Sequence, residues 1–203
     1  MNKWNTLATN ESIAKTIKNL KANGINAVVV ENGSQAKIKV LDLLPKGAEV
    51  MIMSSVTLET LGLPEEINKS SKFDSVKNKL AKMDRKTQGL EMRRIGAAPE
   101  YAIGSVHAVT EDGKLLIASN TGSQLPAYAY GSSHVIWVAG TQKIVKNVDD
   151  GIKRIYEHSL PLESERAKKV YGTPSNVSKL LIINEEISPD RLTIILVKEI
   201  LGF

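Results

Sequence analysis

The predicted fold rests on residues 101–148, which read YAIGSVHAVTEDGKLLIASNTGSQLPAYAYGSSHVIWVAGTQKIVKNV. Short apolar runs bounded by Gly, Asn and Ser are typical of buried strands, and this stretch has three, at 101–103, 115–118 and 135–139. The densest polar and glycine clusters lie between or directly after them, at 110–113, 119–123 and 140–143. Ligands of open α/β sheets bind at the carboxyl ends of strands. The pattern therefore predicts a ligand site in these loops.

Strand and helix patterns alternate before this stretch. A continuous β-branched run at 25–30 and an apolar run at 50–53 each predict a buried strand followed by a helix. This alternation argues for a parallel sheet. After the stretch, two helices are expected at 148–158 and 162–171. Two apolar runs at 179–184 and 192–197, joined by a Ser-Pro-Asp turn signal, predict an antiparallel hairpin.

The expected fold class is therefore α/β, with a Rossmann-like, mostly parallel sheet covered by helices on both faces and a C-terminal antiparallel hairpin. A chain of 203 residues fits one domain, 1–203. No apolar run reaches the length of a membrane span, and the N-terminus lacks a signal-peptide core, so we expect no membrane span and a cytoplasmic protein.

Composition excludes several classes of site. The chain has no cysteine, which rules out thiolate nucleophiles, disulfides and cysteine-ligated zinc or iron–sulfur clusters. The three histidines show no metal-binding spacing, so we expect no metal. Much of the net charge of +5 lies at 67–94, where nine Lys or Arg stand against three acids. A solvated helix face explains this excess better than nucleic-acid binding, because only one aromatic residue is present there.

Hydroxyl side chains follow the predicted strand at 50–53. Ser54, Ser55 and Thr57 precede a helix, where hydroxyls and free N–H groups suit a phosphate or carboxylate. Simple helix capping by a serine is the alternative, and on sequence alone it is favoured about two to one.

The loop after the run at 115–118 is the stronger candidate. Asn120, Thr121, Gly122 and Ser123 offer hydroxyls, an amide and a glycine that permits close backbone approach. The loop lacks the P-loop lysine and the spacing of a dinucleotide fingerprint, so neither ATP nor a Rossmann dinucleotide is indicated. From sequence alone, binding of an anion or a sugar by this loop and a purely structural loop are about equally favoured.

Two residues are candidates for proton transfer. Glu111 precedes an Asp-Gly pair that is typical of a hairpin turn, and it is a candidate general base. His107 follows the run at 101–103, although a lone histidine is more often structural. Gly140 and Lys143 follow the run at 135–139, where Lys143 could bind an anion or simply be solvated.

Strand ends of a parallel sheet share one edge, so these loops are expected to form one cleft. We expect Ser54, Ser55, Glu111, Thr121, Gly122 and Lys143 to converge there. Either Arg93 or Arg94 could approach from the preceding helix, but not both, because adjacent helical positions diverge by about 100°. Buried strands should hide Ile103, Leu116, Ile136 and Val138 almost completely.

Several of these segments resemble the LUD-domain proteins, a family named for lactate utilisation. Its TEDGTL-like segment is similar to residues 110–115, its Gly-Thr-Gly-Asn-Arg-like loop to Thr121-Gly122, and its later Gly and NKIV to Gly140 and residues 143–145. Arg93-Arg94 and the closing ILVKEILGF fit as well. Ser123-Gln124 stands where many members have Asn-Arg, and His107 where Asn is common.

The resemblance implies a fold similar to that of glucosamine-phosphate deaminases, ribose-phosphate isomerases and CoA-transferases. In those relatives the segment matching 102–113 carries acidic catalytic residues, and strand-end loops hold phosphate or CoA. It also implies a small anionic metabolite as ligand, which could contain phosphate or CoA, and iron–sulfur partner proteins of a lactate oxidation system. Because the chain has no cysteine, we expect no cofactor held by the chain itself. A homo-oligomer is left open.

Three functions are compatible with this reading. The first is a subunit or accessory of L-lactate oxidation to pyruvate. The second is a stand-alone enzyme acting on a sugar phosphate or acyl-CoA, with Glu111 as its acid/base. The third is a non-catalytic ligand-binding domain. Superfold analogy does not decide among them.

Overall fold

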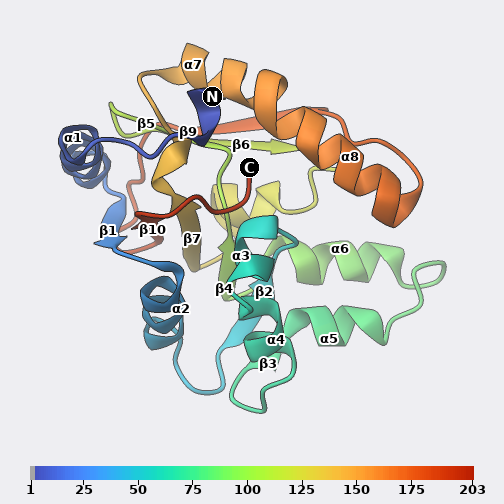
Figure 1. Ribbon diagram of the computed structural model, residues 1–203. Coiled ribbons are helices and arrows are strands. Elements are labelled where there is room, and N and C mark those ends of the chain that lie inside the picture. Colours follow the sequence, from blue (N-terminus) through green and yellow to red (C-terminus); the bar gives the residue numbers. More distant parts are fainter. Residues whose placement is uncertain (1–2) are drawn as a thin grey trace.

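The computed structural model describes residues 3–203, which form two sheets and the helices around them (Figure 1). The main sheet is entirely parallel and has the strand order β1-β10-β7-β4-β2-β3. Its strands are β1 (Asn26–Val30), β2 (Glu49–Ile52), β3 (Asp74–Ser75), β4 (Tyr101–Gly104), β7 (His134–Gly140) and β10 (Leu192–Val197). The parallel α/β fold expected from the sequence is confirmed.

A smaller mixed sheet has the order β8-β5-β6-β9. Its strands are β5 (Ala108–Thr110), β6 (Leu115–Ser119), β8 (Ile144–Val145) and β9 (Lys179–Ile183). The expected C-terminal hairpin is wrong, because β9 pairs antiparallel with β6 whereas β10 lies between β1 and β7 in the main sheet. Their continuous apolar runs reflect burial in two different sheets, which local turn signals do not distinguish.

Helices connect and cover the strands. They are α1 (Asn10–Ala22), α2 (Gly33–Asp42), α3 (Val56–Thr60), α4 (Leu63–Asn68), α5 (Val76–Ala81), α6 (Gly89–Ala97), α7 (Val148–Arg154) and α8 (Leu160–Tyr171). Short 3-10 turns occur at Lys3–Asn5 and Thr141–Lys143, and π-helical turns at Ala127–Gly131 and Ile155–Ser159.

Local chemistry explains where α1 begins and ends. The Thr9 hydroxyl accepts a hydrogen bond from the Ser12 backbone N–H, which caps the first turn. Gly24 follows with a φ of +74°, a left-handed conformation that glycine adopts without strain. The chain then enters β1 directly.

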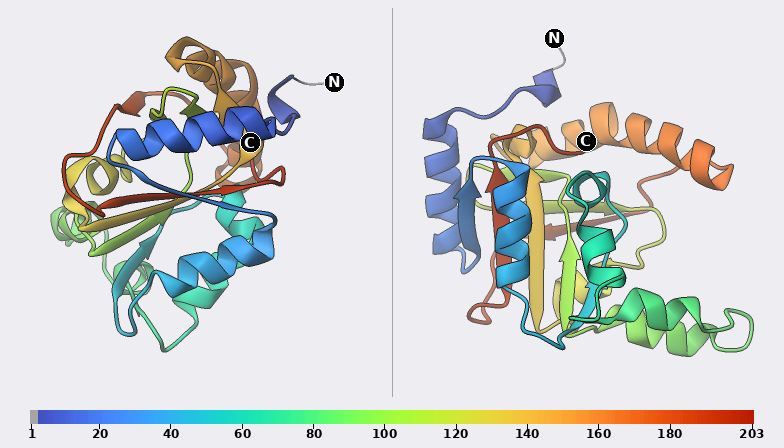
Figure 2. Two further views of the ribbon diagram at one scale, coloured as in Figure 1. Left: turned by 90° about the vertical axis from the view of Figure 1, so that its left-hand side faces the viewer. Right: turned by 60° about the horizontal axis from the view of Figure 1, so that its bottom comes forward.

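The two faces of the main sheet are covered differently (Figure 2). One face packs on α2, α3 and α4 through a cluster that includes Val40, Leu58 and Ile136. The other packs on α1 and on the smaller sheet, through a cluster that includes Leu20, Leu115 and Trp137. Helices therefore cover both faces, but the smaller sheet shares the second face with α1.

Residues 148–171 form one continuous helical segment instead of two separate helices. The π-helical turn at Ile155–Ser159 joins α7 to α8, and Pro161, which has no N–H to donate, stands two residues after that turn. The break expected between residues 158 and 162 is therefore wrong, because the widened turn continues the helical segment through it.

The segment 77–98, which contains most of α5 and all of α6, projects from the body of the molecule as a helical arm (Figure 1). None of its side chains is buried. It carries seven Lys or Arg against two acids, a difference that equals the formal net charge of the whole chain. Among the described residues, no helix is long and apolar enough to cross a membrane.

The strand placement is tested at Ile136, in the middle of β7. Ile136 is 3% exposed, and Ile103, Leu116 and Val138 are completely buried, as predicted. We expect Ile136→Ala to lower the free energy of unfolding by about 2–5 kcal/mol, because it leaves a cavity among well-packed neighbours. Urea denaturation measures the change, with the exposed Ile38→Ala as a control; a loss below about 1 kcal/mol would contradict this packing.

Candidate functional site

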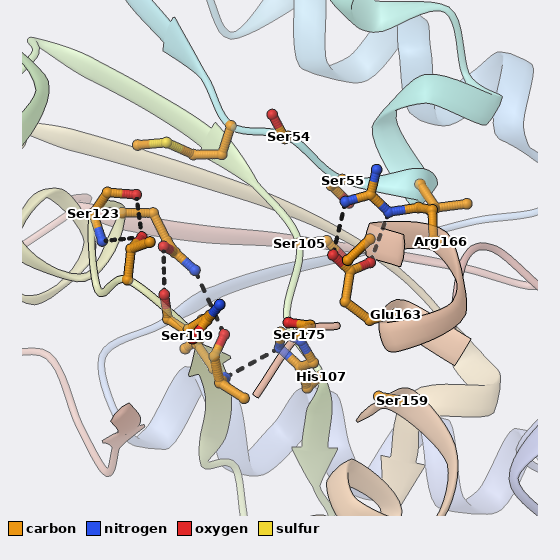
Figure 3. A pocket seen from close by; sticks show the side chains of 18 of the residues that line it. Ser54, Ser55, Ser105, His107, Ser119, Ser123, Ser159, Glu163, Arg166 and Ser175 are labelled. Carbon is orange, nitrogen blue, oxygen red and sulfur yellow. Dashed lines mark hydrogen bonds and ion pairs between the residues drawn. The ribbon is translucent and has the colours of Figure 1, made fainter. Parts of the chain in front are cut away.

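One cleft of about 620 Å³ lies at the carboxyl ends of β2, β4, β6 and β7. The loop after β2 contributes Ser54 and Ser55, the loop after β4 contributes Ser105, and the loop after β6 contributes Ser119 and its neighbours (Figure 3). Helix α8 forms a further wall, because it lies beyond the ends of the main-sheet strands (Figure 2). The sequence predicts a ligand site at strand ends, and this cleft lies there.

Lys143 joins the ends of three neighbouring strands. It follows β7 in a 3-10 turn, and its Nζ donates to Thr57 Oγ1 at 3.2 Å, Ser105 Oγ at 3.2 Å and the Val106 carbonyl at 3.1 Å. Thr57 follows β2, whereas Ser105 and Val106 follow β4. The side chain is only 2% exposed although it lines the cleft.

The groups around Lys143 are cationic or neutral. Arg154 of α7 is fully buried and donates to the His107 carbonyl at 2.7 Å. Burial lowers the pKa of Arg154 to about 10, so it stays charged at neutral pH. Burial and the charge of Arg154 together lower the pKa of Lys143 to about 7.

His107 is neutral in this setting. Burial, followed by the charges of Lys143 and Arg154, holds the pKa of His107 well below its ordinary value. Its Nδ1 accepts a hydrogen bond from the Ala118 backbone N–H at 3.2 Å, which places the proton of the neutral ring on Nε2. His107 therefore contributes an N–H donor to the cleft, where it lies below Ser105 in Figure 3.

The π-helical turn positions Arg154. Its Nη1 donates to Ser159 Oγ at 3.1 Å, a contact between residues five apart that this turn brings together. Ser159 also lines the cleft. Within residues 3–203, Nε and Nη2 of Arg154 have no hydrogen-bond acceptor, which is costly for a buried guanidinium. The helix thus holds an incompletely satisfied positive charge behind the cleft.

The hydroxyls after β2 face the cleft without a capping role. Ser55 occupies the N-cap position of α3 but makes no side-chain capping bond. Capping, the favoured alternative from sequence, is therefore wrong for Ser55. Ser54 lies beside it at the cleft wall (Figure 3).

The loop after β6 is held by its own side chains. Ser119 Oγ accepts from the Gly122 N–H at 2.8 Å and donates to Gln124 Oε1 at 2.9 Å. Gly122 has a φ of +83°, and a Cβ there would lie 2.5 Å from the side chain of Lys179. Glycine at this position shapes the loop, while Asn120, Thr121 and Ser123 line the cleft.

The outer wall carries further charge. Arg166 of α8 forms a two-bond fork with Glu163, with both distances 2.7 Å. Lys77 and Arg85 of the helical arm also line the cleft. Among the described lining residues Glu163 is the one acidic side chain, and it is already paired, so the side chains of the cleft make it electropositive.

Glu111 does not lie in the cleft, which contradicts its expected convergence with the other loops. It belongs to the β5–β6 hairpin, where its carboxylate binds Ser12 Oγ and Lys15 Nζ of α1, both at 2.8 Å. The hydrogen bond from Lys15, and to a lesser extent that from Ser12, lowers the pKa of Glu111. The Asp-Gly turn therefore carries Glu111 away from the strand ends, as the hairpin alternative anticipated.

Four other candidates also lie outside the lining, and one of them is Gly122, whose neighbours Thr121 and Ser123 do line it. Arg93 and Arg94 are exposed on α6, and Arg94 contacts Glu91 at 3.5 Å. Gly140 packs closely against the chain, since a Cβ there would lie 2.3 Å from the Glu199 carbonyl oxygen. The cleft thus contains Ser54, Ser55, Thr57, His107, Asn120, Thr121, Ser123 and Lys143 from the sequence-based set.

Sequence reasoning missed several side chains that line the cleft or lie behind it. Ser105 could have been found, because it directly follows the apolar run at 101–103. Arg154, Ser159 and Arg166 lie within helices and carry no local signal. Among the described residues no group of His, Asp or Glu could hold a metal ion.

Comparison with known proteins agrees with this architecture. The family model of the LUD domain matches residues 13–197. A crystal structure of a DUF162 family protein from Deinococcus radiodurans is similar in fold, with a TM-score of 0.59 at 12% identity. The alignment covers 95% of this chain and 99% of that one. No curated protein matches the sequence.

The buried Lys143 predicts a specific pH dependence of stability. Its folded-state pKa of about 7 lies below the ordinary value of 10.5, so between these values the unfolded chain binds more protons. Stability should therefore rise with pH in that window, at up to about 1.4 kcal/mol per pH unit for one proton. The penalty is fully present below pH 7.

Lys143→Met should remove this contribution, whereas the exposed Lys146→Met should retain it. Urea denaturation between pH 7 and 10 measures the difference between the two variants. Parallel pH profiles for both variants would show that Lys143 is not desolvated.

Proposed function

Because the chain belongs to the LUD-domain family, which is linked to lactate utilisation proteins, we propose that it binds a small anionic metabolite in the cleft and acts in L-lactate utilisation. The family relationship supports the metabolic setting, and the cleft supports the ligand class.

The observation that carries the ligand class is the unbalanced positive charge of Lys143, which lines the cleft, and of Arg154, which lies behind it. Lys143 and Arg154 are almost fully buried, and neither contacts a carboxylate within residues 3–203. Burying cations without a counter-charge is unfavourable. A bound carboxylate or phosphate would supply that charge and would accept from the hydroxyls of Ser54, Ser55 and Ser105.

The donor set favours an anion over a neutral sugar. The cleft offers the His107 N–H, several hydroxyls and the cations Lys77 and Arg85, against one acidic side chain, Glu163, that is already paired. Charge-assisted hydrogen bonds of this type are about twice as strong as neutral ones. A phosphate- or CoA-containing ligand has the required charge, as does a short carboxylic acid.

Electron transfer in lactate oxidation would require a partner. The chain has no cysteine and therefore no thiolate to hold an iron–sulfur cluster. Iron–sulfur proteins of the same system would supply the redox centre, while this chain would bind substrate or product.

Ligand binding is tested by thermal unfolding in phosphate, pyruvate and L-lactate. A ligand that binds only the native state raises stability by about 2.7 kcal/mol at 100 times its Kd. For a chain of this size that corresponds to a midpoint shift of roughly 5–10 °C. Lys143→Met should reduce the shift, and Lys146→Met should preserve it. Absence of a shift with every anion, at saturating concentration, would refute the anion site.

The metabolic role is tested by deleting the gene in its host. Growth on L-lactate should slow severalfold, while growth on pyruvate should be unchanged, because pyruvate enters metabolism after the oxidation step. Complementation with the wild-type gene should restore growth, and complementation with the Lys143→Met gene should not. Equal growth of the deletion strain on both carbon sources would contradict a role in lactate utilisation.

A further inference from the structure

Lys143 is more deeply buried than a lysine needs to be in order to attract an anion. Such lysines extend into solvent and keep a hydrated ammonium group. Here the whole side chain is 2% exposed, and Nζ is held between Thr57 Oγ1, Ser105 Oγ and the Val106 carbonyl oxygen. Lys143 nevertheless lines the cleft, so a ligand in the cleft can contact this side chain.

Every charged or titratable group that perturbs this amine opposes its protonation. Arg154 approaches from α7, and the titratable rings of His107 and His158 lie near the same two cations. No carboxylate of residues 3–203 makes an ion pair with Lys143, and Glu163, the acidic side chain of the cleft wall, is bound to Arg166. The arrangement favours a neutral amine with a free lone pair.

The hydrogen bonds around Nζ suit that neutral form. Thr57 Oγ1 can accept from Nζ because its own proton is directed to the Leu201 carbonyl at 3.2 Å. The Val106 carbonyl is a second acceptor. Ser105 is a hydroxyl, so it can rotate to donate to the lone pair of Nζ, and its other acceptors are more distant, at 3.3 and 3.4 Å. Ser105 can therefore deliver or receive a proton at the amine.

We propose that Lys143 forms a Schiff base with the carbonyl group of a 2-oxo acid bound in the cleft. The amine selects a ligand with a reactive carbonyl, and the electropositive lining selects a ligand that also carries a carboxylate. A 2-oxo acid has both groups on adjacent carbons. This inference rests on the anion site of the proposed function and names the ligand class.

The covalent step balances without an oxidant or a reductant. The lone pair of Nζ attacks the carbonyl carbon, and the carbonyl oxygen takes up a proton to give a carbinolamine. Nitrogen then loses its proton, the C–O bond breaks, and water leaves as the C=N bond forms. Ser105 is placed to relay the proton between nitrogen and the departing hydroxyl.

The test is reductive trapping of the wild-type protein with pyruvate and sodium cyanoborohydride at pH 7.5, followed by peptide mass mapping. We expect one reduced pyruvate adduct, on Lys143, forming at least about tenfold faster than on any other lysine because the other amines are more fully protonated. Lys146→Met should label equally well, and Lys143→Arg should not label. Inorganic phosphate at saturating concentration should slow the labelling of the wild-type protein about tenfold, a result that requires no variant to fold.

Absence of an adduct on Lys143, or adducts spread evenly over surface lysines, would overturn the Schiff-base inference. Thermal stabilisation by phosphate distinguishes this failure from failure of the anion site. Stabilisation without an adduct leaves the proposed function standing and removes only the covalent step. If Lys143 is labelled, but phosphate neither slows the labelling nor stabilises the protein, the amine and the anion do not share one site.

Discussion

The hydrogen bonds from Lys143 Nζ to Thr57, Ser105 and Val106 unite the carboxyl ends of β2, β4 and β7. These three strands are neighbours in the main sheet, so one side chain fixes how their loops meet. The same side chain is buried beside Arg154, and burial together with that charge lowers its pKa to about 7. The geometry of the site and its chemistry both follow from this placement.

A second constraint comes from the helical segment at 148–171. Its π-helical turn lets Arg154 bond Ser159 and brings both residues behind the cleft, while α8 continues as the outer wall. A regular α-helix would align Arg154 with residues three and four away instead. Helix α7 covers the smaller sheet, and the irregular turn at its end therefore fixes the charge of Arg154 behind the cleft.

Much of the fold could be predicted from the sequence because strands buried on both faces leave continuous apolar runs. Val135, Ile136 and Val138 illustrate this, and all three are buried. The pairing of β9 and β10 could not be predicted, since strands that follow each other in sequence need not share a sheet. Local turn chemistry placed the Asp112-Gly113 hairpin correctly, but it could not show that Glu111 would turn toward α1.

The candidate site was predictable where residues directly follow strands and unpredictable where helices supply them. Ser54, Thr121 and Lys143 lie in strand-end loops and are in the cleft, whereas Arg154 and Arg166 are set by helix packing. The burial of Lys143 was also invisible in sequence, because a lysine after a strand is usually solvated. Its desolvation depends on three segments that are far apart along the chain.

The most direct measurement is an NMR titration of the Lys143 side chain, labelled with ¹⁵N at Nζ, in the absence and presence of saturating phosphate. The account predicts a pKa of about 7 for the free protein. It also predicts that a bound anion raises this pKa toward the ordinary value of 10.5, because a nearby negative charge favours the ammonium form. A pKa near 10.5 that does not respond to phosphate would contradict both the buried amine and the anion site.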